Sequence, residues 1–151
     1  MDSIWGDFRR LDRITGWVLF VISTAVYTFT LEPTVSFWDC GEFILSSFRL
    51  QVGHPPGAPL FLMIGRIASL FALGDTSKVA LMMNALSAVS SGFAIMFLYW
   101  TITHLVRKVY GWTNEAASGH IPSIIGSGVI GALAYTFSDT FWFSAVEGEL
   151  Y

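Results

Sequence analysis

The sequence predicts an all-α membrane protein, on three observations. The chain of 151 residues is 54% hydrophobic and only 13% charged, whereas soluble domains carry about 25% charged residues. Residues 14–31 and 79–106 contain no Asp, Glu, Lys or Arg, and residues 121–143 contain only Asp139. These runs approach or exceed the ~20 apolar residues that cross a bilayer. We therefore predict transmembrane helices at 14–31, 79–106 and 121–143 in one polytopic domain, residues 1–151.

Basic residues at the start of the chain predict its orientation. Arg9, Arg10 and Arg13 immediately precede the run 14–31, and the positive-inside rule places such residues in the cytoplasm. The following loop, residues 32–78, then lies on the outer face. A cleaved signal peptide is the alternative, but the uncharged run is longer than the roughly 7–15 residues of a signal core.

The outer loop 32–78 is predicted to contain two short membrane-associated helices, at about 39–50 and 57–73. The second helix is apolar with Arg66 near its centre, and an arginine at the bilayer centre costs at least ~2.5 kcal/mol on insertion scales. If this helix does not cross, Arg107 and the adjacent lysine are cytoplasmic, as the positive-inside rule favours. A full crossing would reverse that orientation and stays open.

The remaining composition excludes some classes of function. The net charge is −3 and no basic run is present, so nucleic acid is not an expected partner. The single cysteine, Cys40, cannot form an internal disulfide and is interpreted as a small packing residue. Asn84, Ser87 and Ser91 recur at helical spacing in an otherwise apolar run, which is typical of a face that packs against another helix.

The predicted outer loop 32–78 contains most of the candidate functional residues. Asp39 and Glu42 lie in Trp-Asp-Cys-Gly-Glu-Phe, and His54 opens His-Pro-Pro-Gly eleven residues after that motif. Asp39 is also a candidate helix cap, with Glu42 in the first turn, where the helix dipole favours anions. Pro and Gly make the His54 segment a turn. The acids Glu147 and Glu149 follow the third apolar run.

These motifs resemble the GT-C class of membrane glycosyltransferases. Protein O-mannosyltransferases carry an Asp-Glu pair in the first outer loop followed by a His-Pro-Pro helix, and aminoarabinose transferases carry an acid followed by Lys-Pro-Pro. The sequence motifs around Asp39, His54 and Glu147 resemble those of a family of bacterial membrane proteins. That family is related to a eukaryotic transmembrane O-mannosyltransferase. Here the two acids are separated by Cys-Gly, so which acid takes which role is open.

The resemblance implies GT-C-like N-terminal transmembrane helices from a longer enzyme. Its reaction is the inverting transfer of a sugar from a polyprenyl phosphate to a protein or lipid acceptor. The setting is the outer face of a bacterial inner membrane, or of the endoplasmic reticulum in a eukaryote. Asp39 would be the base, since such a transfer needs a carboxylate to accept the acceptor's proton. The other candidate residues orient the acceptor, bind phosphate or hold a divalent metal: Glu42, Arg49, His54, Arg66, Glu147 and Glu149.

A transporter subunit or a membrane scaffold without catalysis is the competing interpretation. Arg66 and Asp139 are the ionisable residues that could lie within the membrane, where transporters place such groups. Most of the acids instead fall in the predicted outer loops, and this distribution favours the transferase.

Overall fold

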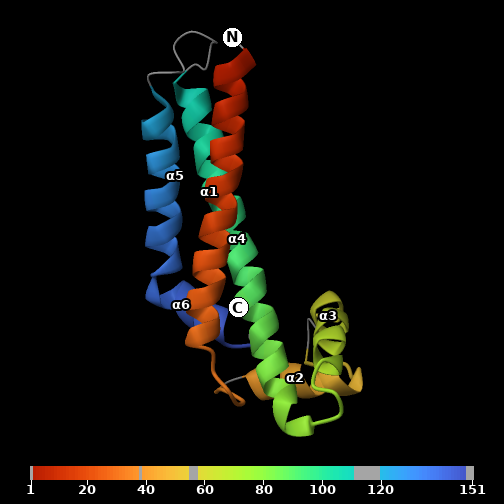
Figure 1. Ribbon diagram of the computed structural model, residues 1–151. Coiled ribbons are helices and arrows are strands. Elements are labelled where there is room, and N and C mark those ends of the chain that lie inside the picture. Colours follow the sequence, from red (N-terminus) through yellow and green to blue (C-terminus); the bar gives the residue numbers. More distant parts are fainter. Residues whose placement is uncertain (1, 38, 55–57, 111–119, 149–151) are drawn as a thin grey trace. The chain divides into compact units, whose positions relative to one another are not determined.

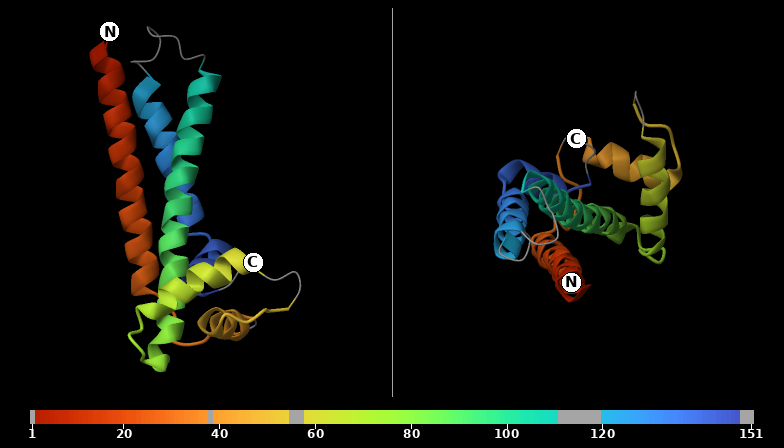
Figure 2. Two further views of the ribbon diagram at one scale, coloured as in Figure 1. Left: turned by 90° about the vertical axis from the view of Figure 1, so that its right-hand side faces the viewer. Right: turned by 90° about the horizontal axis from the view of Figure 1, so that it is seen from above.

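The computed structural model describes residues 2–37, 39–54, 58–110 and 120–148 (Figures 1 and 2). Within these ranges all regular structure is helical and no strand occurs, so the all-α prediction is confirmed. The helices follow one another along the chain as α1 (Asp2–Phe29), α2 (Cys40–Arg49), α3 (Pro59–Leu70), a 3₁₀ turn η1 (Thr76–Lys78), α4 (Val79–Val109), α5 (Ile121–Thr136) and α6 (Asp139–Val146).

The chain forms two compact units. The first comprises Met1–Thr24 and Gly92–Ser138, in which parts of α1 and α4 run beside α5 (Figure 1). Gly16 allows α1 to approach α4 closely, because a Cβ there would lie 2.6 Å from the Trp100 Nε1 atom. The same indole donates a hydrogen bond to the Asp12 carbonyl at 3.3 Å. Close packing and one polar contact therefore join α1 to α4 in this unit.

The second unit comprises Ala25–Ser91 and Asp139–Tyr151 and contains α2, α3 and α6. In it, α2 and α3 lie across one another beside the first turns of α4 (Figure 2). A Cβ at Gly65 of α3 would lie 2.6 Å from Met83 Cε and 2.7 Å from Ser47 Oγ. The absence of a side chain at Gly65 therefore sets how closely α3 packs against α2 and α4.

Asn84 joins three segments of this unit. Its side chain is 1% exposed, and its Nδ2 group donates to the carbonyls of Glu32 at 2.7 Å and Thr34 at 3.1 Å. The Glu32 N–H donates to the Val146 carbonyl at 3.3 Å, and a Cβ at Gly148 would lie 3.1 Å from Asn84 Oδ1. The start of the loop that leads to α2 and the end of α6 are thus both held at one position of α4.

The helix boundaries differ from the sequence predictions mainly in the run 121–143. The helices predicted at 39–50 and 57–73 are present as the slightly shorter α2 and α3. The run 121–143, predicted as one span, instead contains α5 and α6. Asp139 stands in the first turn of α6, where the helix dipole favours an acid. Ser138 donates to the Tyr135 carbonyl at 2.8 Å, so this Ser-Asp pair favours a new helix over continuation of α5.

The length and composition of the helices show which of them could cross a membrane. Within the described residues, one helix, Thr76–Val109, has the length and composition to cross a bilayer, and α5 with α6 would add a second as one broken span. The helix α1 is not in this group, because its N-terminal half carries polar and charged residues such as Arg9 and Asp12. Three spans and a multi-pass location therefore stay predictions.

We predict that Asn84→Leu lowers the free energy of unfolding by about 1–3 kcal/mol, because two carbonyls lose their donor in a buried setting. Thermal unfolding in detergent measures the loss. Hydrogen exchange should show the largest increase at residues 32–37, which the amide holds. Thr101→Ala, which removes a hydroxyl that bonds only within α4, is the control. Unchanged exchange at 32–37 in Asn84→Leu would contradict the prediction.

Candidate functional site

Asp39 stands at the N-cap position of α2 without using its carboxylate as a cap. Its backbone carbonyl accepts the first helical hydrogen bond, from the Phe43 N–H at 3.0 Å. The side chain makes no capping hydrogen bond and is 49% exposed. Asp39 therefore occupies the predicted N-cap position, but its carboxylate does not cap the helix, and its oxygens are accessible for another role.

Glu42 and His54 form the best-defined polar contact of the site. The Glu42 Oε1 atom accepts a hydrogen bond from the His54 backbone N–H at 2.6 Å, and its Oε2 atom lies 3.0 Å from His54 Nδ1. The other imidazole nitrogen, Nε2, lies 4.0 Å from Asp39 Oδ2. One carboxylate thus fixes both the backbone and the ring of His54, and the ring faces the second carboxylate.

The turn before His54 has the shape that this contact requires. A Cβ at Gly53 would lie 3.2 Å from Glu42 Oε1 and 3.9 Å from Ser46 Oγ, so glycine allows the backbone to pass close to the carboxylate. The Phe43 ring lies 6.0 Å from the His54 ring, centroid to centroid. The Pro-Pro-Gly segment at 55–57, which the sequence analysis treated as part of the same turn, lies outside the described residues.

The contact changes the pKa of both partners in opposite directions. The hydrogen bond to Glu42, together with the negative charges of Glu42 and Asp39, raises the pKa of His54 above its ordinary value despite some desolvation. The hydrogen bonds from the His54 backbone and ring lower the pKa of Glu42. The ion pair is complete above the lowered Glu42 pKa and below the raised His54 pKa. Acid removes it by protonating Glu42, and base removes it by deprotonating His54.

The predicted phosphate ligands do not all gather at this site. Arg66 donates to the Phe48 carbonyl at 2.6 Å and its guanidinium lies 5.4 Å from the centre of the Phe48 ring, so it links α3 to α2. Arg49 is the last residue of α2. At a rise of ~1.5 Å per residue along the helix axis, its Cα lies about 15 Å from that of Asp39. Of the three cationic candidates, His54 is the one held between the two carboxylates.

The second acidic motif belongs to the same unit. Glu147 directly follows α6, whereas Glu149 lies outside the described residues. A Cβ at the intervening Gly148 would lie 4.0 Å from Ile44 Cγ1, so this segment contacts α2. The expectation that Glu147 shares a cavity with Asp39 stays a prediction.

Asp39, Glu42 and His54 also form a set that suits a divalent metal. Each offers one ligand atom, and the three atoms lie within 4.8 Å of one another. Carboxylate oxygens with an imidazole nitrogen are ordinary ligands for zinc and manganese. In the described geometry, however, Nδ1 of His54 is occupied by Glu42, which leaves Nε2 and the carboxylates as the atoms that would hold an ion.

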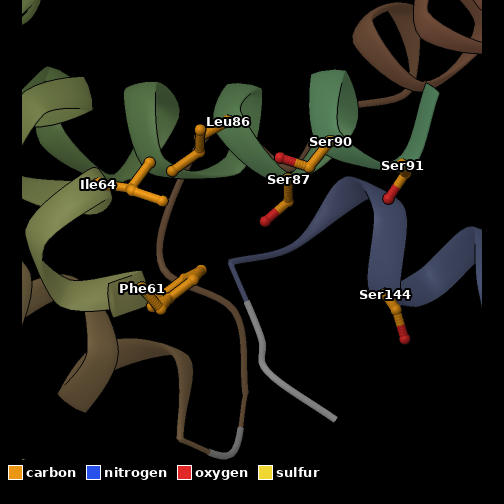
Figure 3. A pocket seen from close by; sticks show the side chains of 7 residues that line it. All are labelled: Phe61, Ile64, Leu86, Ser87, Ser90, Ser91 and Ser144. Atoms are coloured by element: carbon orange, nitrogen blue, oxygen red, sulfur yellow. The ribbon is translucent and has the colours of Figure 1, made fainter. Parts of the chain in front are cut away.

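A second feature of this unit is a cavity of about 300 Å³ whose lining includes both serine and apolar side chains (Figure 3). Phe61 and Ile64 of α3 form an apolar side, and α4 contributes Ser87, Ser90 and Ser91. Their spacing predicts that two of these serines belong to a helix-packing face, but it indicates neither the cavity beside them nor the anchoring role of Asn84. The cavity and the anchor could have been suspected from one signal, the recurrence of Asn84, Ser87 and Ser91 in an otherwise apolar helix.

Comparison with known proteins identifies related sequences. A family model described as the protein O-mannosyl-transferase TMEM260 N-terminal domain matches residues 39–151. The chain is 32% identical over 134 residues to "Protein O-mannosyl-transferase tmem260" of Dictyostelium discoideum, covering 89% of this chain and 14% of that protein. It is 28% identical over 134 residues to "Protein O-mannosyl-transferase TMEM260" of Mus musculus, covering 88% and 16%. No solved structure matches. The chain thus spans less than a fifth of the length of these relatives.

We predict that Glu42→Gln lowers the pKa of His54 toward the unperturbed value of ~6.5, because the amide keeps the size of the side chain but loses its charge. A titration of the His54 ring followed by NMR measures this. Asp39→Asn is the matched comparison and should lower the pKa less, since Asp39 is the weaker of the two influences. An unchanged His54 pKa in Glu42→Gln would show that the two side chains do not interact in solution.

Proposed function

This chain belongs to the family described as the protein O-mannosyl-transferase TMEM260 N-terminal domain, and we propose that it is part of a glycosyltransferase that acts on proteins. The named relatives support this class of reaction. The observation that carries the proposal is the accessible Asp39 carboxylate beside the Glu42–His54 pair. The matched region begins at Asp39 itself.

In the proposed mechanism Asp39 is the general base. The acceptor hydroxyl attacks the anomeric carbon of the sugar from the face opposite the leaving group, and its proton passes to Asp39. The bond from the anomeric carbon to the phosphate oxygen breaks, and the phosphate leaves with the bonding electrons. A proton acceptor placed within hydrogen-bond reach contributes typically 10²–10⁴-fold to such a step.

His54 is proposed to interact with the departing phosphate. Because Glu42 contacts Nδ1 of His54 and raises its pKa, the protonated ring would present a positioned cationic N–H at Nε2. A cationic donor that is already oriented stabilises charge that develops on the leaving oxygen. Glu42 thereby acts through His54, and this arrangement assigns different roles to the two acids. If a divalent metal is bound, Asp39, Glu42 and His54 would hold it, and it would supply the same stabilisation of negative charge.

The donor and the location form the finer part of the proposal. A polyprenyl-phosphate sugar as donor, an outer-face site and inversion at the anomeric carbon follow from the resemblance of the Asp39 and His54 motifs to GT-C enzymes. The apolar composition and the long apolar helix α4 are consistent with a donor that is itself membrane-bound. A lipid acceptor is retained as the alternative to a protein acceptor.

We predict that Asp39→Asn in the full-length protein reduces sugar transfer by roughly 10²–10⁴-fold, because the amide keeps the size of the side chain but has no useful basicity. Donor binding and thermal stability should remain nearly unchanged, since the carboxylate makes no capping bond. Transfer from a polyprenyl-phosphate sugar to a protein acceptor, measured beside donor binding, tests this. Near-normal transfer by Asp39→Asn with an inactive Glu42→Gln would assign the base to Glu42, and near-normal transfer by both would remove this loop from the chemistry.

The proposed orientation has its own test, by cysteine labelling in a Cys40→Ser background. We expect an impermeant thiol reagent added to the outer side to label Ser77→Cys, which lies in the predicted outer loop. Asn114→Cys, in the predicted cytoplasmic loop that lies outside the described residues, should react only after permeabilisation. Labelling of Asn114→Cys from the outer side would overturn the orientation.

A further inference from the structure

Most of the basic residues of the chain gather at one end of the first unit. Of the eight Lys and Arg residues, five lie there: Arg9, Arg10, Arg13, Arg107 and Lys108. The first three stand near the start of α1 and the other two in the last turn of α4, and both segments lie at the same end of this unit (Figure 1). The Arg107 guanidinium lies 5.1 Å from the centre of the Phe8 ring, so the two basic segments are in contact.

A surface depression of about 460 Å³ lies among the arginines of α1. Its lining consists of Arg9, Arg10, Arg13 and Ile14. Arg10 and Arg13 are exposed and stand three residues apart, which places both guanidinium groups on one side of the helix. Neither makes an ion pair with any residue that the structure describes. Two positive charges therefore border the depression without a counter-ion from those residues.

The acids of the same segment leave these charges in place. Asp7 is exposed three residues before Arg10, but among the described residues no ion pair joins it to either arginine. Asp12 has one carboxylate oxygen, Oδ1, buried, and its charge acts on the Tyr99 hydroxyl of α4. The negative charge of Asp12 is thus directed toward the interior of the unit.

An exposed apolar stripe continues α1 directly beyond the arginines. Ile14, Val18 and Val21 are 50%, 48% and 60% exposed, and their spacing places them on the side of the helix that carries Arg10. Trp17 follows Arg13 by about one turn and is 47% exposed, and tryptophan is enriched at membrane–water interfaces. Cations, then an indole, then aliphatic side chains repeat the order of phosphate, glycerol and acyl chain in a phospholipid.

We propose that Arg10 and Arg13 bind the phosphate of a diacyl anionic phospholipid, one acyl chain of which lies along Ile14, Val18 and Val21. Arginine side chains bind phosphate in a bidentate manner, and basic pockets beside membrane helices hold anionic lipid headgroups. The nearby cations of α4 favour a headgroup with net negative charge over a zwitterionic one. The predicted cytoplasmic location of the arginines agrees with this, because the cytoplasmic leaflet carries anionic lipids.

This site differs from a simple orientation signal. Orientation by the positive-inside rule requires only that cations be present on one side of the membrane, whereas the phospholipid site requires two guanidinium groups above an apolar stripe. The site belongs to the first unit, whereas Asp39, Glu42 and His54 belong to the second. Its existence therefore does not depend on the proposed glycosyltransferase chemistry.

Native mass spectrometry of the purified full-length protein in neutral detergent measures the affinity. Dioleoyl phosphatidylglycerol and dioleoyl phosphatidylcholine share their acyl chains and differ in headgroup charge, and we expect the former to bind roughly tenfold more tightly. Arg10→Gln and Arg13→Gln should each weaken phosphatidylglycerol binding by roughly fivefold, the effect of one charge near an anionic lipid. Arg13→Lys, which keeps the charge, should weaken it less. Lys78→Gln removes an exposed cation of the second unit and is the matched control.

The acyl chain has an independent readout. A phosphatidylglycerol that carries a diazirine in one acyl chain should, after illumination, label segment 14–22, as located by peptide mass spectrometry. Val18→Asn should reduce this labelling, because a polar amide replaces part of the apolar stripe. Val89→Asn, at an exposed apolar position of α4, is the matched control. Thermal unfolding of each variant separates a lost site from a misfolded protein.

Three outcomes would overturn the site. Equal binding of the two phospholipids would remove the role of the arginines. Displacement of phosphatidylglycerol by excess glycerol phosphate would show an anion site that makes no use of the acyl chain. Phosphatidylglycerol binding that neither Arg10→Gln nor Arg13→Gln alters would show that the lipid binds elsewhere and would leave an acidic polypeptide segment as the partner of these arginines.

Discussion

The two hydrogen bonds from the Asn84 amide hold together the unit that carries the candidate site. A primary amide buried in an apolar helix is costly unless both N–H groups find acceptors, and here the acceptors are the carbonyls of Glu32 and Thr34. Thr34 lies only five residues before Asp39, so α4 sets where the chain enters α2. The close approach of Gly148 to the same amide brings the end of α6 to this point.

From that anchor, the charged residues are arranged by short-range contacts. Glu42 stands on the first turn of α2, and the loop after α2 returns so that the His54 backbone and ring both donate to it. Gly53 makes this return possible because a side chain there would crowd the carboxylate. Glu42 accepts two contacts from His54, and Asp39 faces the same histidine ring. In a chain with so few charges, these three residues form a concentrated polar centre. That concentration, more than any single acid, distinguishes this loop.

Helix α2 has a polar end and an apolar side. The end that carries Asp39 and Glu42 faces a titratable histidine, whereas the stripe from Gly41 to Phe48 borders an apolar cavity. Arg66 ties this helix to α3 through the Phe48 carbonyl and ring. A short helix held in this way on several sides is a rigid position for the proposed base, which must lie within hydrogen-bond distance of the proton that it accepts.

Much of the architecture could be read from the sequence, because it depends on local composition and periodicity. Apolar runs indicated α4 and the region of α5 and α6, and the Pro and Gly residues near His54 indicated a turn between two short helices. The family resemblance rested on the same motifs, and the matched family confirms it. The residues Asp39, Glu42 and His54 could be selected as candidates because acids and histidine are rare in such a chain.

Only the tertiary structure decided which of these residues meet. Contacts such as Glu42 with His54 depend on how a loop closes, and those of Asn84 with Glu32 and Thr34 join residues about fifty positions apart. Local propensity carries no information on such distances. The same holds for Arg49 and Arg66, which the sequence offered together as candidate phosphate ligands. Packing engages Arg66 with Phe48 and leaves Arg49 beside a cavity, because the position of each on its helix, and the surface that the helix meets, determine what its charge can contact.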